Sequence, residues 1–136
     1  MCIRDRIHTR DADDDTIEIL EDFKGRVKGV IHCFTGSERL AKAALDCGYN
    51  LSFSGIVTFK SAQNLRDIAT VTPIDRLHVE TDAPFLSPMP LRGRKNRPDH
   101  MLWTAKCVAE LHNMPILDFC RQMKINAEAM FPRLLG

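Results

Sequence analysis

The chain has 136 residues, 44% of them hydrophobic and 27% charged, which is the size and composition of a single globular domain. Its formal net charge of +1 excludes whole-molecule attraction to nucleic acid, so any such binding must come from a local basic patch. The five cysteines are widely spaced without a CxxC pair, which argues against a zinc ribbon or a disulfide framework and predicts a cytoplasmic protein. No apolar run approaches the roughly 18 residues of a membrane span, so no membrane partner is expected.

Hydrophobic spacing predicts strands that alternate with helices along the chain. Serine in an N-cap position and glycine after the last turn mark the helix boundaries most clearly. In chain order, the predicted elements are a strand leading into Ile7 and His8, a helix over 14–24, a strand over 27–32, a helix from Ser37 to Gly48, a strand over 49–54, a helix from Ser61 that ends before Pro73, a strand over 76–81, a helix after Pro98 and a helix beginning near Pro115. This order predicts an α/β protein with a parallel sheet.

The spacing of the strand ends carries more information than the alternation. The ends fall at His8, His32, Ser54 and Asp82, which are 24, 22 and 28 residues apart. One strand–helix unit about every 25 residues, repeated eight times, gives the roughly 200 to 250 residues of a (β/α)8 barrel. The four units of this chain therefore fit either a small open sheet or part of a TIM-like barrel.

The first residues have an unexpected composition for a strand of a parallel sheet. A strand buried on both faces should be apolar, but Arg4, Asp5 and Arg6 occupy the positions before Ile7. They are also too polar for a signal peptide. One interpretation is a solvated edge of the sheet, and the other, which we prefer, is a non-native leader over residues 1–6.

Three residues at strand ends have the chemistry of metal ligands. His8, His32 and Asp82 lie at the carboxyl ends of three different strands, which is where α/β barrels keep their active sites. Imidazole and carboxylate are the ligands expected for zinc, manganese or a similar divalent ion. A single histidine or aspartate in such a place is usually structural, but their recurrence at one point of the strand–helix period favours a shared site.

Several sequence motifs resemble, in order and spacing, those of the TatD family of metal-dependent deoxyribonucleases. The match runs from about residue 7 to the C-terminus. The motifs are Ile-His-Thr-Arg-Asp-Ala (7–12), His-Cys-Phe-Thr-Gly (32–36), Leu-Ser-Phe-Ser-Gly (51–55), Glu-Thr-Asp-Ala-Pro-Phe-Leu (80–86), Arg-Gly-Arg-Lys-Asn-Arg-Pro (92–98) and Asn-Ala (126–127).

The resemblance implies a fold, a cofactor and an activity. The fold would be a partial (β/α)8 TIM-like barrel, roughly the last four strand–helix units plus C-terminal helices, over residues 7–136. The cofactors would be two divalent ions, Mg, Mn or Zn, that activate water for cleavage of DNA phosphodiester bonds, with single-stranded ends as the expected substrate. His8 and His32 would bind the second metal. Asp82 would bind the first metal and position or deprotonate the attacking water.

The resemblance also implies that part of the site is absent. The family's His-x-His motif and its bridging glutamate lie upstream of the position that matches His8, and no residue of this chain replaces them. His78, His100 and His112 form no His-x-His pattern, and their spacing favours positions on a helix or strand surface. We therefore expect the 136-residue chain alone to bind metal weakly and to hydrolyse little.

A basic loop after the last predicted strand suggests phosphate recognition. Residues 92–97 contain four basic side chains, a cluster that neutralises phosphates without reading sequence. Arg92, Arg94 and Asn96 fall on the family's Arg-Gly-x-x-Asn-x-Pro pattern, which favours a substrate-side or loop-fixing role for them. Arg97 stands where the family usually has glutamate.

Three other residues invite an interpretation. Glu80 precedes Asp82 by two residues, so both should lie on one face of a strand, where Glu80 can support the metal ligand. Cys33 follows a candidate ligand, but a small buried cysteine beside a strand end is common, so a nucleophilic role is not favoured. Trp103 is expected to pack its helix and not to stack on bases.

Two alternatives to a DNase remain open from the sequence. The first keeps the metal site but hydrolyses another ester or an amide, because a fold does not fix its substrate. The second is a non-catalytic partial barrel that binds nucleic acid or a partner. In either case, an open edge of parallel strands favours self-association.

Overall fold

The computed structural model describes residues 4–132, which form an α/β fold with a parallel sheet. Its strands are β1 (Arg4–Ile7), β2 (Lys28–Ile31), β3 (Asn50–Phe53) and β4 (Leu77–Val79). Its α-helices are α1 (Asp13–Asp22), α2 (Glu38–Asp46), α3 (Gln63–Val71), α4 (Met101–Leu111) and α5 (Ile116–Met130). Short 3-10 helices lie at Gly55–Thr58, Ile74–Arg76 and Pro98–His100.

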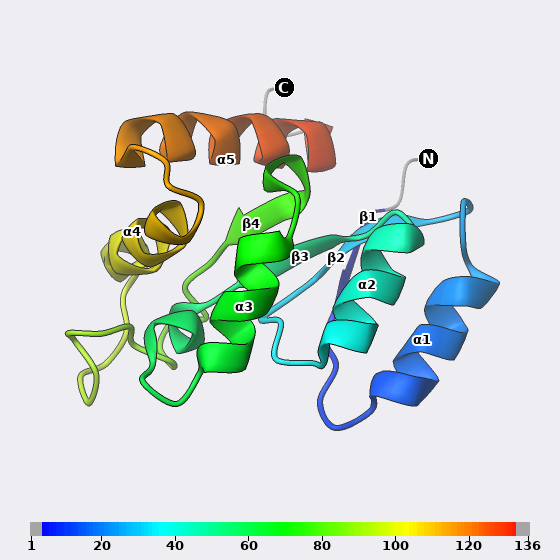
Figure 1. The fold of residues 1–136 in the computed structure, drawn as a ribbon, viewed down its shortest axis with the longest axis horizontal. Helices are drawn as coiled ribbons and strands as arrows, with labels where there is room; N and C mark the ends of the chain where they lie inside the picture. The colour runs from blue at the N-terminus through cyan, green and yellow to red at the C-terminus, as the bar shows by residue number, and fades with distance from the viewer. Residues whose placement is uncertain (1–3, 133–136) are drawn as a thin grey trace.

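The sheet has the simplest order that a repeated strand–helix unit can give, β1-β2-β3-β4 with every pair parallel. Residues at one level of the sheet, such as Ile31, Leu51 and Leu77, are therefore register partners across the strands. The predicted α/β fold with a parallel sheet is confirmed. Because all strands run the same way, the loops that follow them lie together along the lower side of Figure 1.

One hydrophobic core lies between the sheet and the helices. Leu51, Phe53 and Leu77 are almost fully buried in it, together with Leu20 of α1 and Leu40 of α2. Helices α1, α2 and α3 line up over one face of the sheet, whereas α4 and α5 lie beside and beyond β4 (Figure 1). This packing leaves the other side-chain face of the strands free for polar residues.

Helix boundaries follow from local chemistry. The Ser37 hydroxyl accepts a hydrogen bond from the backbone N–H of Leu40, as predicted for the N-cap of α2. Gly25 and Gly48 follow α1 and α2 with φ of +76° and +91°, a conformation that suits glycine after a helix. Among residues 4–132, no helix is both long and apolar enough to cross a membrane.

One sequence-based placement, that of His78, was wrong. His78 was expected on the surface, but it is 9% exposed, and its Nε2 lies 2.9 Å from Asn50 Nδ2. It is buried because it lies on β4 beside β3, on the face opposite the helices. Trp103, which was expected to pack its helix, lies in the first turn of α4 and is 38% exposed, with Nζ of Lys106 on the same helix 4.8 Å from its ring centre.

The N-terminal residues take part in the sheet. Arg4–Ile7 pairs in parallel with Lys28–Ile31, so a strand does lead into His8. The pairing does not depend on the origin of these residues, and a non-native leader over residues 1–6 stays a prediction. Residues 1–3 and 133–136 lie outside the described part of the chain.

Candidate metal centre

Two strand ends bring the candidate ligands together. His32 directly follows β2, and its backbone N–H donates to Ile7 O at 2.8 Å. Glu80 directly follows β4, and its backbone N–H donates to Phe53 O at 3.0 Å. Both backbones therefore continue the sheet's hydrogen bonding by one residue beyond the strands. Asp82 lies two residues further on with φ of +52°, at the start of the long loop to α4.

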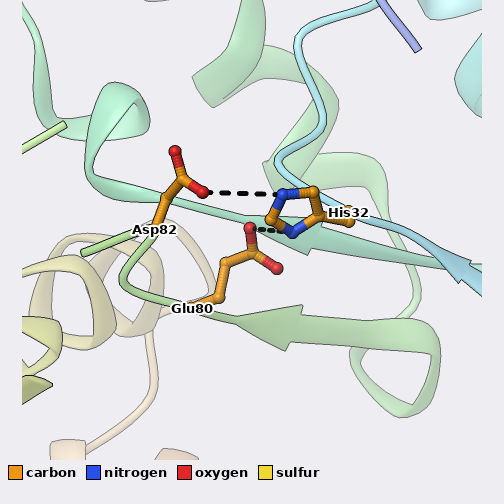
Figure 2. Close-up of side chains that lie close together, drawn as sticks. All are labelled: His32, Glu80 and Asp82. Carbon is orange, nitrogen blue, oxygen red and sulfur yellow. Dashed lines mark ion pairs between the residues drawn. The ribbon is translucent and has the colours of Figure 1, made fainter. Parts of the chain in front are cut away.

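The side chains of His32, Glu80 and Asp82 converge on one point (Figure 2). One ligand atom from each lies within 4.8 Å of the other two, and each residue is partly buried. The imidazole lies between the carboxylates, with Nδ1 2.7 Å from Glu80 Oε1 and Nε2 3.6 Å from Asp82 Oδ1. One imidazole and two carboxylates are a donor set suited to zinc, manganese or magnesium.

The two distances assign different roles to the two ring nitrogens. At Nδ1, the Glu80 carboxylate oxygen Oε1 lies 2.7 Å away, which is an ion-pair contact and brings the carboxylate against the side of the ring opposite Nε2. The 3.6 Å separation at Nε2 is too long for a hydrogen bond. Two ligand atoms about 2.1 Å from one tetrahedral ion lie about 3.4 Å apart, so this separation fits a pair of metal ligands. His32 Nε2 and Asp82 Oδ1 therefore have the spacing needed to hold one ion.

Glu80 has the surroundings of a residue that orients a metal-binding histidine. Its Oε2 accepts a hydrogen bond from Ser52 Oγ at 2.6 Å, which fixes the carboxylate from the neighbouring strand. Its Oε1 is buried and accepts no hydrogen bond from the described residues, and it lies 2.7 Å from His32 Nδ1 as an ion-pair contact. Histidine ligands of metals commonly donate their second N–H to such a carboxylate. The site therefore fits a divalent ion, with Glu80 behind the ligand.

His8 lies next to this cluster without joining it. Its ring centre is 5.9 Å from that of His32, and its side chain is exposed at the end of β1. Among the described residues, the group whose ligand atoms lie close enough for one ion contains His32, Glu80 and Asp82 and not His8. The resemblance implied that His8 and His32 share one ion and that Asp82 binds another, whereas here His32 lies with Asp82 and apart from His8. Which ion each residue binds stays a prediction.

The loop that begins at Asp82 is held by Asn96. The buried side-chain amide of Asn96 donates to Thr81 O and Phe85 O, both at 2.6 Å, and its Oδ1 accepts from Arg97 N at 2.9 Å. These bonds occupy the groups that a substrate would need, so the geometry favours the loop-fixing role over the substrate-binding role for Asn96.

Arg92 and Arg94 remain available to a ligand. Both are exposed, and the Arg92 guanidinium carbon lies 4.1 Å from the centre of the Phe59 ring. The stacked arginine keeps its N–H groups at the ring's edge, where they can reach a phosphate. Binding of substrate by Arg92 and Arg94 stays a prediction.

Gly55 and Ser52 are two contributors that the sequence did not single out. A Cβ atom on Gly55 would lie 2.1 Å from Leu86 O and 3.0 Å from Pro88 N, so only glycine lets the loop approach β3 this closely. Ser52 was part of a recognised motif, but nothing in the sequence paired it with Glu80. The register of β3 with β4, which places Ser52 beside His78, brings Ser52 within reach of Glu80.

Cys33 does not have the environment of a nucleophile. Burial raises the pKa of its thiol, and the nearby charges of Asp82 and Glu80 raise it further, against a lowering by the hydrogen bond to Ser54 and by Arg10. The thiol is therefore protonated at neutral pH and unreactive. This agrees with the structural role expected for it.

Comparison with known proteins identifies the family. The family model described as "TatD related DNase" matches residues 6–132. The chain belongs to this TatD family. Among its curated relatives, the uncharacterized metal-dependent hydrolase YcfH of Escherichia coli (strain K12) is 43% identical over 92% of the chain and 48% of YcfH. The uncharacterized metal-dependent hydrolase YabD of Bacillus subtilis (strain 168) is 40% identical over 92% of the chain and 49% of YabD.

Solved structures of TatD proteins share the fold. The crystal structure of YJJV, a TatD homologue from Escherichia coli K12, superposes with a TM-score of 0.86 at 26% identity, over 96% of this chain and 50% of YJJV. A TatD family hydrolase from Entamoeba histolytica gives a TM-score of 0.84 at 21% identity, which supports the fold alone. The chain thus spans about half the length of the TatD proteins it matches. It has the fold of part of their barrel, as predicted.

Proposed function

We propose that the site is the substrate-cleaving part of a divalent-metal-dependent deoxyribonuclease. The observation that supports this most directly is the 3.6 Å separation of His32 Nε2 from Asp82 Oδ1, with Glu80 Oε1 2.7 Å from the opposite ring nitrogen. His32 and Asp82 would hold a divalent ion, Mg, Mn or Zn, and His8 would contribute to a second ion beside it.

The residues divide the chemistry among them. A bound divalent ion supplies a Lewis acid and lowers the pKa of water towards neutrality. The carboxylate of Asp82 orients the attacking water and accepts its proton. Glu80 Oε1, 2.7 Å from Nδ1 of His32, would orient the imidazole so that Nε2 faces the ion. Ser52 prevents Glu80 from turning away.

The substrate assignment rests on the charge around the site and on the family. Arg92 and Arg94 are exposed on the loop that begins at Asp82, and Arg92 stacks on Phe59, which follows β3 and the 3-10 helix Gly55–Thr58. A phosphodiester held by them would therefore be bound on the loops that follow the strands, as the candidate metal ligands are. The family model that matches is described as a DNase. An ester or amide substrate would gain less from two arginines, which favours phosphodiester cleavage over the other hydrolyses open to this fold.

The 136-residue chain is expected to be a weak enzyme by itself. Its described residues offer His8, His32 and Asp82, with Glu80 behind them, which is a small ligand set for two ions. We expect weak metal binding and little hydrolysis from the chain alone. The outer edges of β1 and β4 have no strand neighbour among residues 4–132, so self-association along these edges is also proposed.

Metal binding is tested in the chain itself by calorimetric titration with Mn²⁺. Asp82→Asn is expected to reduce the affinity by at least about 10-fold, because it removes a charged ligand. Asp67→Asn is the matched control, since Asp67 is an exposed carboxylate on α3 whose side chain bonds Gln63. Equal affinity in the wild type and Asp82→Asn would contradict the metal site.

Hydrolysis is tested in a longer relative such as YcfH, substituted at the residue aligned with Asp82. The substrates are a single-stranded DNA oligonucleotide, an aryl acetate and an aryl amide, each with and without EDTA. We expect DNA cleavage that requires metal and is lost in the variant. Cleavage of the ester or amide without cleavage of DNA would contradict the DNase assignment and leave the metal site standing.

A further inference from the structure

Phe85 combines an exposed aromatic ring with a fixed backbone beside the metal centre. It lies three residues after Asp82, and its side chain is 69% exposed. Its backbone N–H donates to Asp82 O at 2.9 Å, which closes a turn, and its carbonyl accepts from Asn96 Nδ2 at 2.6 Å. In a four-residue turn the first and last Cα atoms lie within about 7 Å, so the Phe85 side chain leaves the backbone close to Asp82.

The exposure of this ring does not come from a loosely packed loop. Leu86, the next residue, packs its carbonyl against Gly55, and Met89 N donates to Thr58 Oγ1 at 2.8 Å. The residues that follow Phe85 are therefore attached to the 3-10 helix Gly55–Thr58, which comes directly after β3. Single exposed apolar side chains are common on protein surfaces, but this phenyl ring is held by a well-bonded backbone close to Asp82, where it can contact a ligand of the site.

The charges on the same loop indicate which kind of ligand the ring can contact. Exposed basic residues lie on the same loop, at Arg92, Arg94 and Lys95. In contrast, the open cleft along residues 9–15 and 35–37 carries four aspartates against one arginine, Arg10, a balance that disfavours phosphate. A polyanion that reaches Asp82 would therefore approach over the loop that contains Phe85 and not along the acidic cleft.

We propose that Phe85 stacks on an unpaired base of single-stranded DNA next to the phosphodiester that is cleaved. This inference rests on the proposed function and deepens it. Basic side chains that follow the backbone, together with an aromatic ring that takes a base, are the usual combination in proteins that bind single strands. A base inside a duplex is already stacked on both faces, so Phe85 selects frayed or single-stranded ends.

The experiment measures binding without hydrolysis. Fluorescence anisotropy in EDTA follows the chain binding to a labelled eight-nucleotide oligothymidylate and to an abasic oligomer of the same length and charge. Phe85→Ala is expected to weaken oligothymidylate binding by at least about 5-fold, the lower end of what base–aromatic stacking contributes, and to leave abasic binding unchanged. Phe85→Tyr keeps the ring and should restore most of the affinity.

Controls separate the ring from folding and from general charge. Phe23→Ala removes another exposed phenylalanine, one that lies at the far end of α1 with Arg26 4.6 Å from its ring centre. It should leave both affinities unchanged. Urea denaturation checks that Phe85→Ala remains folded, which is expected because the ring is mostly exposed.

The outcomes distinguish this inference from the proposed function. If the wild type binds both oligomers equally and Phe85→Ala changes neither, stacking is wrong while phosphate binding stands. If Phe85→Ala weakens both oligomers alike, Phe85 acts through the shape of the loop and the stacking role is overturned. If the wild type binds neither oligomer, both the DNA assignment and the stacking role are contradicted.

Discussion

Replacing Gly55 by alanine tests whether the loop that carries Asp82 depends on close backbone contact with the end of β3. The added Cβ atom would lie 2.1 Å from Leu86 O, 3.0 Å from Pro88 N and 3.2 Å from Pro88 Cα. All three are backbone or ring-fixed atoms, so no side chain can turn away to make room. Ordinary contact begins at about 3.4 Å, so the loop must move outward by roughly 1.3 Å at Leu86.

The expected loss of stability follows from that displacement. Overpacking a well-packed site typically costs 1–3 kcal/mol, and contacts with backbone lie at the upper end of this range. We expect the free energy of unfolding of Gly55→Ala to fall by about 3 kcal/mol. Because Asp82 and Leu86 belong to one loop tied together by Asn96, the displacement should also move Asp82 away from His32 and lower the affinity for Mn²⁺.

The assay pairs urea denaturation with calorimetric Mn²⁺ titration. Gly48→Ala is the matched control, because a Cβ there meets no atom within 4 Å but the backbone has φ of +91°. Its cost is the strain of a left-handed alanine, about 1 kcal/mol, with unchanged metal affinity. A Gly55→Ala variant with wild-type stability and wild-type Mn²⁺ affinity would refute the claim that contact at Gly55 positions the site.

Three further substitutions test separate parts of the structure. Glu80→Gln should lower Mn²⁺ affinity by about 10-fold or more, measured by calorimetry, because a neutral amide holds the N–H of His32 less strongly. Ser37→Ala should reduce the free energy of unfolding in urea by about 1 kcal/mol through loss of the α2 N-cap, and an unchanged midpoint would contradict that role. Burial lowers the pKa of His78 below its ordinary 6.5, so the unfolded chain binds more protons as the pH falls through 6.5 and the wild type loses stability there. His78→Leu should therefore show a shallower dependence of stability on pH below 6.5, by at most about 1.4 kcal/mol per pH unit, in urea titrations at several pH values.

Periodic features of the chain could be predicted from its sequence. The strand–helix alternation and the parallel sheet follow from hydrophobic spacing, and α2 begins and ends where Ser37 and Gly48 predict. The meeting of His32 with Asp82 follows from the same logic, since the carboxyl ends of parallel strands share one edge. These predictions succeed because they depend on neighbours in sequence or on a fixed period.

Features that depend on contacts between strands and loops could not be predicted in the same way. The burial of His78 arises from Asn50 on the adjacent strand, whose own Oδ1 accepts from Arg76 Nε at 2.7 Å and leaves Nδ2 facing the imidazole. The function of Gly55 depends on its contact with Leu86, 31 residues further along the chain. A glycine in the sequence does not show which residue it will contact. The loop-fixing amide of Asn96 needs the positions of Thr81 and Phe85 before its role is apparent.

Buried polar residues of the sheet explain how the side chains of the candidate metal centre are held in place. A parallel strand covered on both faces is usually apolar throughout, but β3 alternates, with Leu51 and Phe53 packed in the helix-side core and Asn50 and Ser52 on the opposite face. Each of these polar side chains is bonded to one on or just after β4, Asn50 to His78 and Ser52 to Glu80.

The two cross-strand pairs form a ladder that ends at the candidate ligands. Burial of Asn50 and Ser52 without partners would cost stability, so their pairing lets the face remain polar as far as Glu80. The carboxylate of Glu80, fixed in this way, lies with Oε1 2.7 Å from Nδ1 of His32 and so restricts the orientation of the imidazole. The alternation of apolar and polar residues in Leu-Ser-Phe-Ser-Gly therefore serves both the core and the site. Leu51 and Phe53 on one face pack in the core, and Ser52 on the other face binds the Glu80 carboxylate that orients His32.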